Sequence, residues 1–172
     1  MIVDRKWGMA SKDTFTVKPI KEFVEDAVSR LPAGAVIVDP FARESKYGTI
    51  TNDLNPKFDT DYHMDALDFL KMMGASSADM VIYDPPYSPR QVSECYSGFG
   101  YEVTSEMTRS SWKYRHMDEI ARILKSGGIL LSFGWNSNGA GAKRGFDITR
   151  IRLVAHGGGS AHDTICMEEV KK

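Results

Sequence analysis

The chain has 172 residues, of which 42% are hydrophobic and 26% are charged, and its formal net charge is −1. This composition is that of an ordinary globular protein, and the length suits a single domain, residues 1–172, that buries roughly 70% of its unfolded surface. No apolar stretch approaches the ~20 residues of a membrane span, and the first residues lack the apolar core of a signal peptide. We therefore expect a cytoplasmic protein with no membrane partner.

The two cysteines and four histidines show no metal-ligand spacing. We therefore expect neither a disulfide framework nor a metal site. A nearly neutral chain also lacks the overall positive charge that phosphate contacts require, so any surface for nucleic acid must be local.

In chain order, the first expected element is an amphipathic helix from Lys18 to Leu31. Its apolar residues recur at spacings of three and four, which places them on one face: Ile20, Phe23, Val24, Ala27, Val28 and Leu31. Pro19 suits the first turn, and the Pro-Ala-Gly sequence at 32–34 ends the helix. The all-apolar run at 35–38 then predicts a buried parallel strand.

The rest of the chain alternates strands and helices. We expect strands at 48–53, 61–64, 80–83 and 129–133, helices at 66–73 and around 117–124, and a closing antiparallel hairpin of 146–154 with 164–168. This pattern predicts an α/β fold with a mostly parallel seven-stranded sheet. In such a sheet, the ligand crevice lies at the carboxyl ends of the strands.

Four acids fall at or just beyond expected strand ends: Asp39, Asp53, Asp65 and Asp84. Structural needs alone hardly explain four carboxyl groups on one rim of a sheet. We interpret this rim as a ligand-binding site.

The segment Asp84-Pro85-Pro86-Tyr87 directly follows the expected strand at 80–83. An aromatic amine is a poor nucleophile because its lone pair is delocalised, unless acceptors hold its two N–H groups. Asp84 and the Pro85 carbonyl are suitable acceptors, since the prolines fix the backbone before a substrate arrives, and Tyr87 can stack on a planar base. The alternative is a strand that ends in a Pro-Pro turn, with the aspartate as a cap.

Three blocks of sequence, in this order, resemble a known family: Thr16-Val17-Lys18-Pro19, Asp39-Pro40-Phe41-Ala42 and Asp84-Pro85-Pro86-Tyr87. From about Asp13 to Ser137 the chain resembles the S-adenosylmethionine-dependent amino methyltransferases, most closely the small adenine-specific DNA methyltransferases of phages and bacteria. The resemblance implies a Rossmann-like class I methyltransferase fold. It also implies S-adenosylmethionine as cofactor, and methyl transfer to the N6 amine of an adenine that is flipped out of DNA.

The resemblance also implies roles for individual residues. Thr16 and Lys18, with Pro19, would hold the carboxylate end of the cofactor, although Lys18 also reads as a solvated residue at a helix start. Asp39-Pro40-Phe41-Ala42 would form the turn that approaches the cofactor. Where the family has two glycines in the next three residues, this chain has Arg43-Glu44-Ser45, a clear departure.

Two further acids match cofactor contacts of the family. Asp53 matches the acid that binds the ribose hydroxyls. Asp65, with Ala66, resembles the segment that accepts from the adenine amino group of the cofactor. For Asp65, a simple N-cap of the following helix is an equal alternative.

Nucleic-acid binding is assigned to two segments, 88–114 and 136–145. Cations and aromatic residues interleave there, which suits phosphate contact and base stacking, and the candidates are Arg90, Arg109, Trp112, Lys113, Lys143 and Arg144. The alternative is an ordinary surface loop whose aromatic residues pack on the domain. A two-fold dimer would enlarge the DNA surface.

Three other functions remain open. An RNA adenine or protein-glutamine methyltransferase can use the same acceptor pair, although the glutamine enzymes usually have Asn at the position of Asp84. A catalytically silent relative that binds nucleic acid or a partner would explain the altered loop at 43–45.

His156 and His162 are interpreted as turn and surface residues rather than as ligands or bases.

Overall fold

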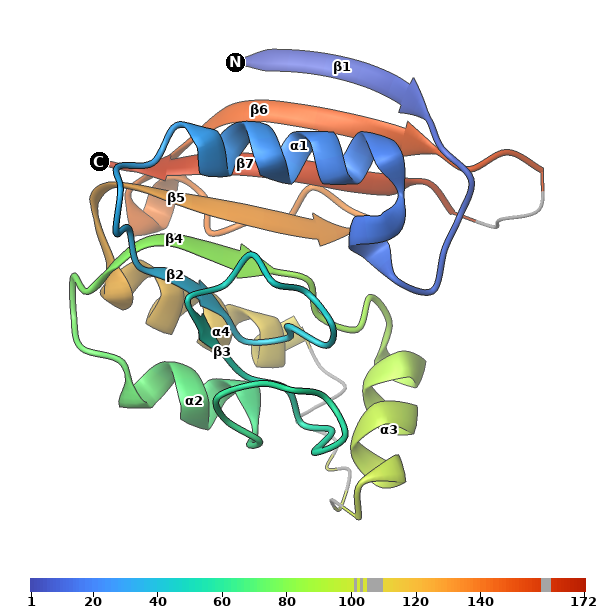
Figure 1. Ribbon diagram of the computed structural model, residues 1–172, viewed down its shortest axis with the longest axis vertical. Helices are drawn as coiled ribbons and strands as arrows, with labels where there is room; N and C mark the ends of the chain where they lie inside the picture. The colour runs from blue at the N-terminus through green and yellow to red at the C-terminus, as the bar shows by residue number, and fades with distance from the viewer. Residues whose placement is uncertain (101, 103, 105–109, 159–161) are drawn as a thin grey trace.

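One sheet runs through the molecule (Figure 1). The computed structural model describes residues 1–100, 102, 104, 110–158 and 162–172. Within these residues seven strands pair in the order β1-β6-β7-β5-β4-β2-β3. Their bounds are β1 Ile2–Trp7, β2 Ile37–Asp39, β3 Ile50–Thr51, β4 Ala78–Tyr83, β5 Leu124–Gly134, β6 Phe146–Ala155 and β7 Thr164–Lys171.

The sheet is parallel except around β7. Strand β7 is antiparallel to both of its neighbours, β5 and β6, whereas the other adjacent pairs are parallel. The arrowheads of β1, β4, β5 and β6 consequently point to the same side in Figure 1, and that of β7 points the opposite way. The predicted α/β fold, with a mostly parallel seven-stranded sheet and a terminal antiparallel hairpin, is confirmed.

The strands differ from the prediction in two places: one strand was missed, and one expected strand does not form. Strand β1 was not expected, and it takes the seventh place by pairing with β6 at the edge of the sheet. The expected strand at 61–64 is reduced to an isolated bridge between Asn52 and Tyr62. There the Asp61 carboxylate accepts hydrogen bonds from the backbone N–H and the hydroxyl of Thr51, both at 2.8 Å, so a side chain replaces part of the expected strand ladder.

Four α-helices are described: α1 Lys18–Ser29, α2 Ala66–Met72, α3 Pro89–Gly98 and α4 Ser110–Ile123. Helix α3 lies in a segment that was expected to be a loop. Its start carries ordinary signals, because the Ser88 hydroxyl accepts from the Gln91 N–H at 3.2 Å and Pro89 occupies the first turn. Short 3₁₀ helices occur at Thr14–Thr16 and Ala142–Arg144.

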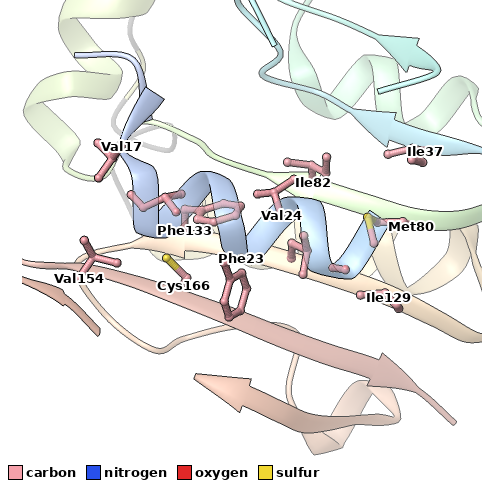
Figure 2. Packing of buried hydrophobic residues seen from close by; sticks show 13 residues of the cluster. Val17, Phe23, Val24, Ile37, Met80, Ile82, Ile129, Phe133, Val154 and Cys166 are labelled. Atoms are coloured by element: carbon pink, nitrogen blue, oxygen red, sulfur yellow. The ribbon is translucent and has the colours of Figure 1, made fainter. Parts of the chain in front are cut away.

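Helices cover both faces of the sheet. Helix α1 packs on one face, where Phe23 and Val24 contact the layer that contains Met80 and Ile82 (Figure 2). On the opposite face α2 and α4 pack on alternate residues of the same strand, including Val81. Strand β4 is therefore buried on both sides, as the apolar run at 80–83 predicts, and this fixes the position of the segment that follows it.

None of the helices described is long and apolar enough to cross a membrane.

Candidate functional site

A pocket of about 570 Å³ lies at the carboxyl ends of the parallel strands, and segments next to all seven described strands line it. The parallel strands contribute the residues that follow their carboxyl ends. Because β7 runs in the opposite direction, it contributes its beginning. The lining residues used below are Lys12, Thr14, Val17, Phe41, Arg43, Asp53, Phe58, Asp84, Pro85, Pro86, Tyr87, Gln91, Trp135, His156, His162 and Thr164.

Asp84 directly follows β4 and is held by its neighbours. The Tyr87 hydroxyl donates to Asp84 Oδ1 at 2.5 Å, and the Thr14 side chain also hydrogen-bonds the carboxylate. Burial raises the pKa of Asp84 above its ordinary value, and these hydrogen bonds partly oppose that rise. The site thus contains a carboxylate in an enclosed place, oriented before any ligand arrives.

The rest of the segment is also in place. Pro85, Pro86 and Tyr87 all line the pocket, and the Tyr87 N–H donates to Gln91 Oε1 at 2.7 Å, which ties the segment to helix α3. The Tyr87 ring meets Trp135 edge-on, with ring centroids 5.8 Å apart. The four residues expected to carry the chemistry are therefore brought together in one pocket.

Of the turn Asp39-Pro40-Phe41-Ala42, only Phe41 lines the pocket. Asp39 is fully buried behind it, where Oδ1 accepts from the Phe41 N–H at 3.1 Å and Oδ2 has no hydrogen-bond partner within the described residues. Burial, with the nearby charges of Asp84 and Asp53, raises the pKa of Asp39 to about 8. The side-chain amide of Asn52 donates to the Pro40 carbonyl at 3.1 Å, and the Ala42 N–H donates to the Asn52 carbonyl at 2.9 Å.

Asp53 lies on the pocket wall, as its predicted role requires. Its carboxylate accepts from the N–H groups of Asn55 at 2.8 Å and Arg43 at 3.1 Å. Burial raises its pKa, and the two hydrogen bonds partly offset this effect. Because a carboxylate offers about four acceptor positions, Asp53 retains capacity for two ligand hydroxyls.

Asp65 is the N-cap of α2, which is the alternative stated for it. Oδ1 accepts from the N–H groups of Leu67 at 2.9 Å and Asp68 at 3.2 Å, and Oδ2 accepts from the Tyr96 hydroxyl at 2.8 Å. Asp65 and the buried Ala66 do not line the pocket. The structure therefore does not bring Asp65 to the other predicted cofactor contacts.

Loss of this cap gives a stability prediction. We expect Asp65→Ala to lower the free energy of unfolding by about 1 kcal/mol, because two backbone donors of α2 lose their acceptor. Asp65→Asn keeps an acceptor and should cost clearly less. Urea unfolding of the three proteins measures the difference, and equal stability of Asp65→Ala and the natural chain would contradict the capping role.

The segment around the start of α1 lines the pocket with residues other than the expected Thr16, Lys18 and Pro19. Thr16 Oγ1 contacts Ser11 Oγ at 2.8 Å, and Lys18 is 87% exposed and lies 4.0 Å from Glu22. Pro19 is buried within α1. None of the three lines the pocket, whereas Thr14 and Val17 of the same segment do.

The residues assigned to nucleic acid are scattered, and the described ones lie outside the pocket lining. Arg90 is exposed and pairs with Glu94 at 2.7 Å, and Arg144 pairs with Asp118 at 2.6 Å. Trp112 is only 8% exposed, so its ring packs on the domain, as the alternative for this segment has it.

The remaining cations of this set differ in their surroundings. Lys143 is exposed, whereas burial lowers the pKa of Lys113 below its ordinary value. Arg109 lies outside the described residues.

The β6–β7 turn contributes pocket residues that sequence reasoning missed. His156 and His162, which were interpreted as turn and surface residues, both line the pocket. His162 packs on Trp135 with ring centroids 4.1 Å apart, and His156 lies 2.8 Å from the Thr164 hydroxyl. The predicted hairpin held the necessary signal, because its turn returns to the edge where the parallel strands end.

Arg43 has an unusual backbone. Its φ is 49°, in the left-handed region that favours glycine and costs other residues about 1–2 kcal/mol. Arg43 stands where the resembling family has its glycine-rich turn, so the turn keeps a glycine-like conformation without glycine. The guanidinium donates to Asp13 Oδ1 at 3.0 Å and lies 5.4 Å from the Phe58 ring centroid.

No protein-family model and no curated protein matches the sequence. Solved structures do match. They include yhhF from Escherichia coli, assigned as a methyltransferase, with a TM-score of 0.59, 10% identity, and coverage of 95% of this chain and 89% of that one. Another is the 1,6-didemethyltoxoflavin-N1-methyltransferase of Burkholderia thailandensis with S-adenosylhomocysteine, with a TM-score of 0.60, 11% identity, and coverage of 90% and 77%.

A third similar structure is NSun6 from Pyrococcus horikoshii with SFG, with a TM-score of 0.58 and 13% identity. The match covers 86% of this chain but only 50% of that one, so the chain spans about half the length of NSun6. The strand order and these similarities together define the fold of this chain as the Rossmann-like class I methyltransferase fold.

Proposed function

We propose that the protein transfers a methyl group from S-adenosylmethionine to the N6 amine of adenine in DNA. The observation that carries the proposal is the position of Asp84. It follows the strand β4, which is buried on both faces, and its carboxylate is oriented by Tyr87 in the pocket at the strand ends. In class I methyltransferase folds this edge of the sheet is the ligand edge, in line with the general rule for open parallel sheets.

The pocket suits the cofactor in size and charge. A volume of about 570 Å³ lies within the usual range of small-molecule and cofactor sites. Asp53 and Asp84 place two carboxylates on its wall, which can contact a cationic group of a ligand, and Lys12 and Arg43 balance their charge. S-adenosylmethionine, when bound, supplies a methyl group on a positively charged sulfur.

Asp84 would hold the acceptor amine. Its carboxylate has about four acceptor positions, and the hydrogen bonds to Tyr87 and Thr14 leave about two of them, enough to accept one amine N–H. The Pro85 carbonyl would accept the second N–H, and the proline pair keeps both acceptors in a fixed geometry. These contacts favour a pyramidal nitrogen whose lone pair is available for attack.

The Tyr87 hydroxyl gives a pH prediction. Its hydrogen bond lowers the pKa of Asp84, so Tyr87→Phe should raise that pKa while it keeps the aromatic ring. Because Asp84 must be ionised to accept from the amine, the rise of kcat/KM with pH should shift to higher pH in the variant. Tyr47→Phe, which removes a hydroxyl that contacts Glu25 elsewhere, is the control. An unchanged pH profile in Tyr87→Phe would contradict the role of this hydrogen bond.

Methyl transfer from labelled S-adenosylmethionine tests the proposed function. Unmethylated duplex DNA, single-stranded DNA and tRNA are compared as acceptors, and digested products are analysed as nucleosides. N6-methyladenine from DNA supports the proposal. Label only on RNA, or no label from a folded protein that binds the cofactor, would overturn the assignment to DNA.

A second candidate function follows from one observation. Arg43, where the family has glycine, donates to Asp13, which stands between the lining residues Lys12 and Thr14 in the sequence. This feature favours a catalytically silent relative that binds nucleic acid or a partner protein but not the cofactor, and calorimetry with S-adenosylhomocysteine distinguishes the two. A folded protein that does not bind would favour the silent relative.

A further inference from the structure

Arg43 connects two segments that border the pocket. Its backbone N–H donates to Asp53 Oδ2 at 3.1 Å, on the side of the predicted ribose contact. Its guanidinium reaches Asp13 in the segment before α1, at 3.0 Å. The left-handed backbone at Arg43 is unfavourable for any residue but glycine, so a side chain retained there calls for a reason beyond the turn itself.

The surroundings of the guanidinium are strongly acidic. The charge of Arg43 acts on both Asp53 and Asp84, and Asp13 is its direct partner. Among the described lining residues, Lys12 and Arg43 are the ones with a lysine or arginine side chain. Arg43 is 47% exposed and Asp13 is 29% exposed, so their ion pair is open to exchange with a ligand.

We propose that Arg43 binds the carboxylate of the amino-acid part of the cofactor, and that Asp13 occupies this position until the cofactor exchanges with it. The inference rests on the proposed function. A guanidinium presents paired N–H donors that match a carboxylate, and Asp13 already offers a carboxylate to it. Under the proposed function Asp53 contacts the ribose and Asp84 the acceptor amine, and the guanidinium contacts Asp13, next to the lining residue Thr14.

The proposal moves to Arg43 a role that the family resemblance implies for Lys18. The Lys18 side chain is almost fully exposed, contacts Glu22 and lies outside the pocket lining. Arg43 is inside the lining. The replacement of the family's glycine by arginine would therefore move the carboxylate contact from the start of α1 to the turn after β2.

Calorimetric binding of two ligands tests the proposal. S-adenosylhomocysteine has the amino-acid carboxylate, whereas 5′-methylthioadenosine lacks it. Arg43→Gly removes the guanidinium and also suits the left-handed backbone, so it should fold at least as well as the natural chain. We expect this variant to weaken the binding of S-adenosylhomocysteine by about 10- to 100-fold, and the binding of 5′-methylthioadenosine by less than about 2-fold.

Two more variants sharpen the result. Asp13→Asn removes the competing carboxylate. It should strengthen the binding of S-adenosylhomocysteine by several-fold and leave the affinity for 5′-methylthioadenosine unchanged. Lys46→Ala removes a charge from the same loop, at a residue that pairs with Asp59 outside the pocket, and should change neither.

The failures of the two proposals are distinguishable. Suppose that the natural chain binds S-adenosylhomocysteine, and that Arg43→Gly weakens the binding of both ligands equally or the binding of neither. The role of Arg43 is then overturned, and the proposed function stands. If the natural chain, shown to be folded, binds neither ligand, both are overturned.

Discussion

Asp84→Asn is expected to lower the turnover of methyl transfer by about 10³-fold, while the affinity for S-adenosylhomocysteine stays within about threefold. Asparagine keeps the shape of the side chain and can still accept from the Tyr87 hydroxyl, so the fold and the pocket are preserved. It removes the negative charge that stabilises the amine as positive charge develops on its nitrogen. The loss therefore falls on the transition state rather than on cofactor binding.

Single-turnover methyl transfer and calorimetry, made on the same samples, measure the two quantities separately. Asp84→Ala should lose at least as much activity, because the N–H acceptor is also gone. Asp147→Asn, at an exposed acid that pairs with Lys172, is the matched control and should keep full activity. Parallel loss of binding and turnover in Asp84→Asn would show that Asp84 holds the cofactor instead of the acceptor amine.

Asp39→Asn is expected to make the protein more stable than the natural chain at pH 9, by several kcal/mol. The pKa of Asp39 is raised from 3.8 to about 8 in the folded protein, so the native state holds a proton that the unfolded chain releases. Stability is then highest below the unfolded pKa and falls by up to about 1.4 kcal/mol per unit as pH rises toward 8. The neutral amide of asparagine has no proton to lose in this range.

Urea unfolding at pH 5, 7 and 9 checks this prediction. Asp53 and Asp84 also have raised pKa values, so both proteins should lose some stability with pH, and the difference between them isolates Asp39. At pH 5 the natural chain should be at least as stable as Asp39→Asn, because the buried Asp39 carboxyl is then protonated and carries no charge. Parallel stability profiles across this range would mean that Asp39 is ionised in the folded state.

The elements with strong periodicity were predictable from the sequence. The apolar stripe at 18–31 predicted α1, and the apolar run at 80–83 predicted β4, each within two residues, and the second run positioned Asp84. Strand β1 was missed because it carries three adjacent charges and is exposed on both faces, so it shows no alternation. An edge strand of this kind owes its conformation to its partner β6 rather than to its own pattern.

The site was predictable in outline, since strand ends gather at one edge, but its contacts were not. Helix α4 begins at Ser110, before the apolar stripe that predicted it, so Trp112 and His116 share its inner face with Ile120 and are buried. A cation-rich sequence pattern cannot reveal that burial. The hydrogen bond from Tyr87 to Asp84 depends on side-chain rotamers, and the left-handed Arg43 runs against residue preference.

The distribution of the pocket along the chain links ligand binding to the integrity of the whole domain. Its lining extends from Ala10 to Thr164 and includes residues next to each of the seven described strands, so a partly unfolded chain cannot retain it. A ligand of this pocket therefore binds only the native state and stabilises it globally, by about 2.7 kcal/mol at a concentration 100 times its Kd. Thermal shift with candidate nucleosides is thus a sensitive screen for this protein, and damage to any one strand, even the N-terminal edge strand, should weaken the response.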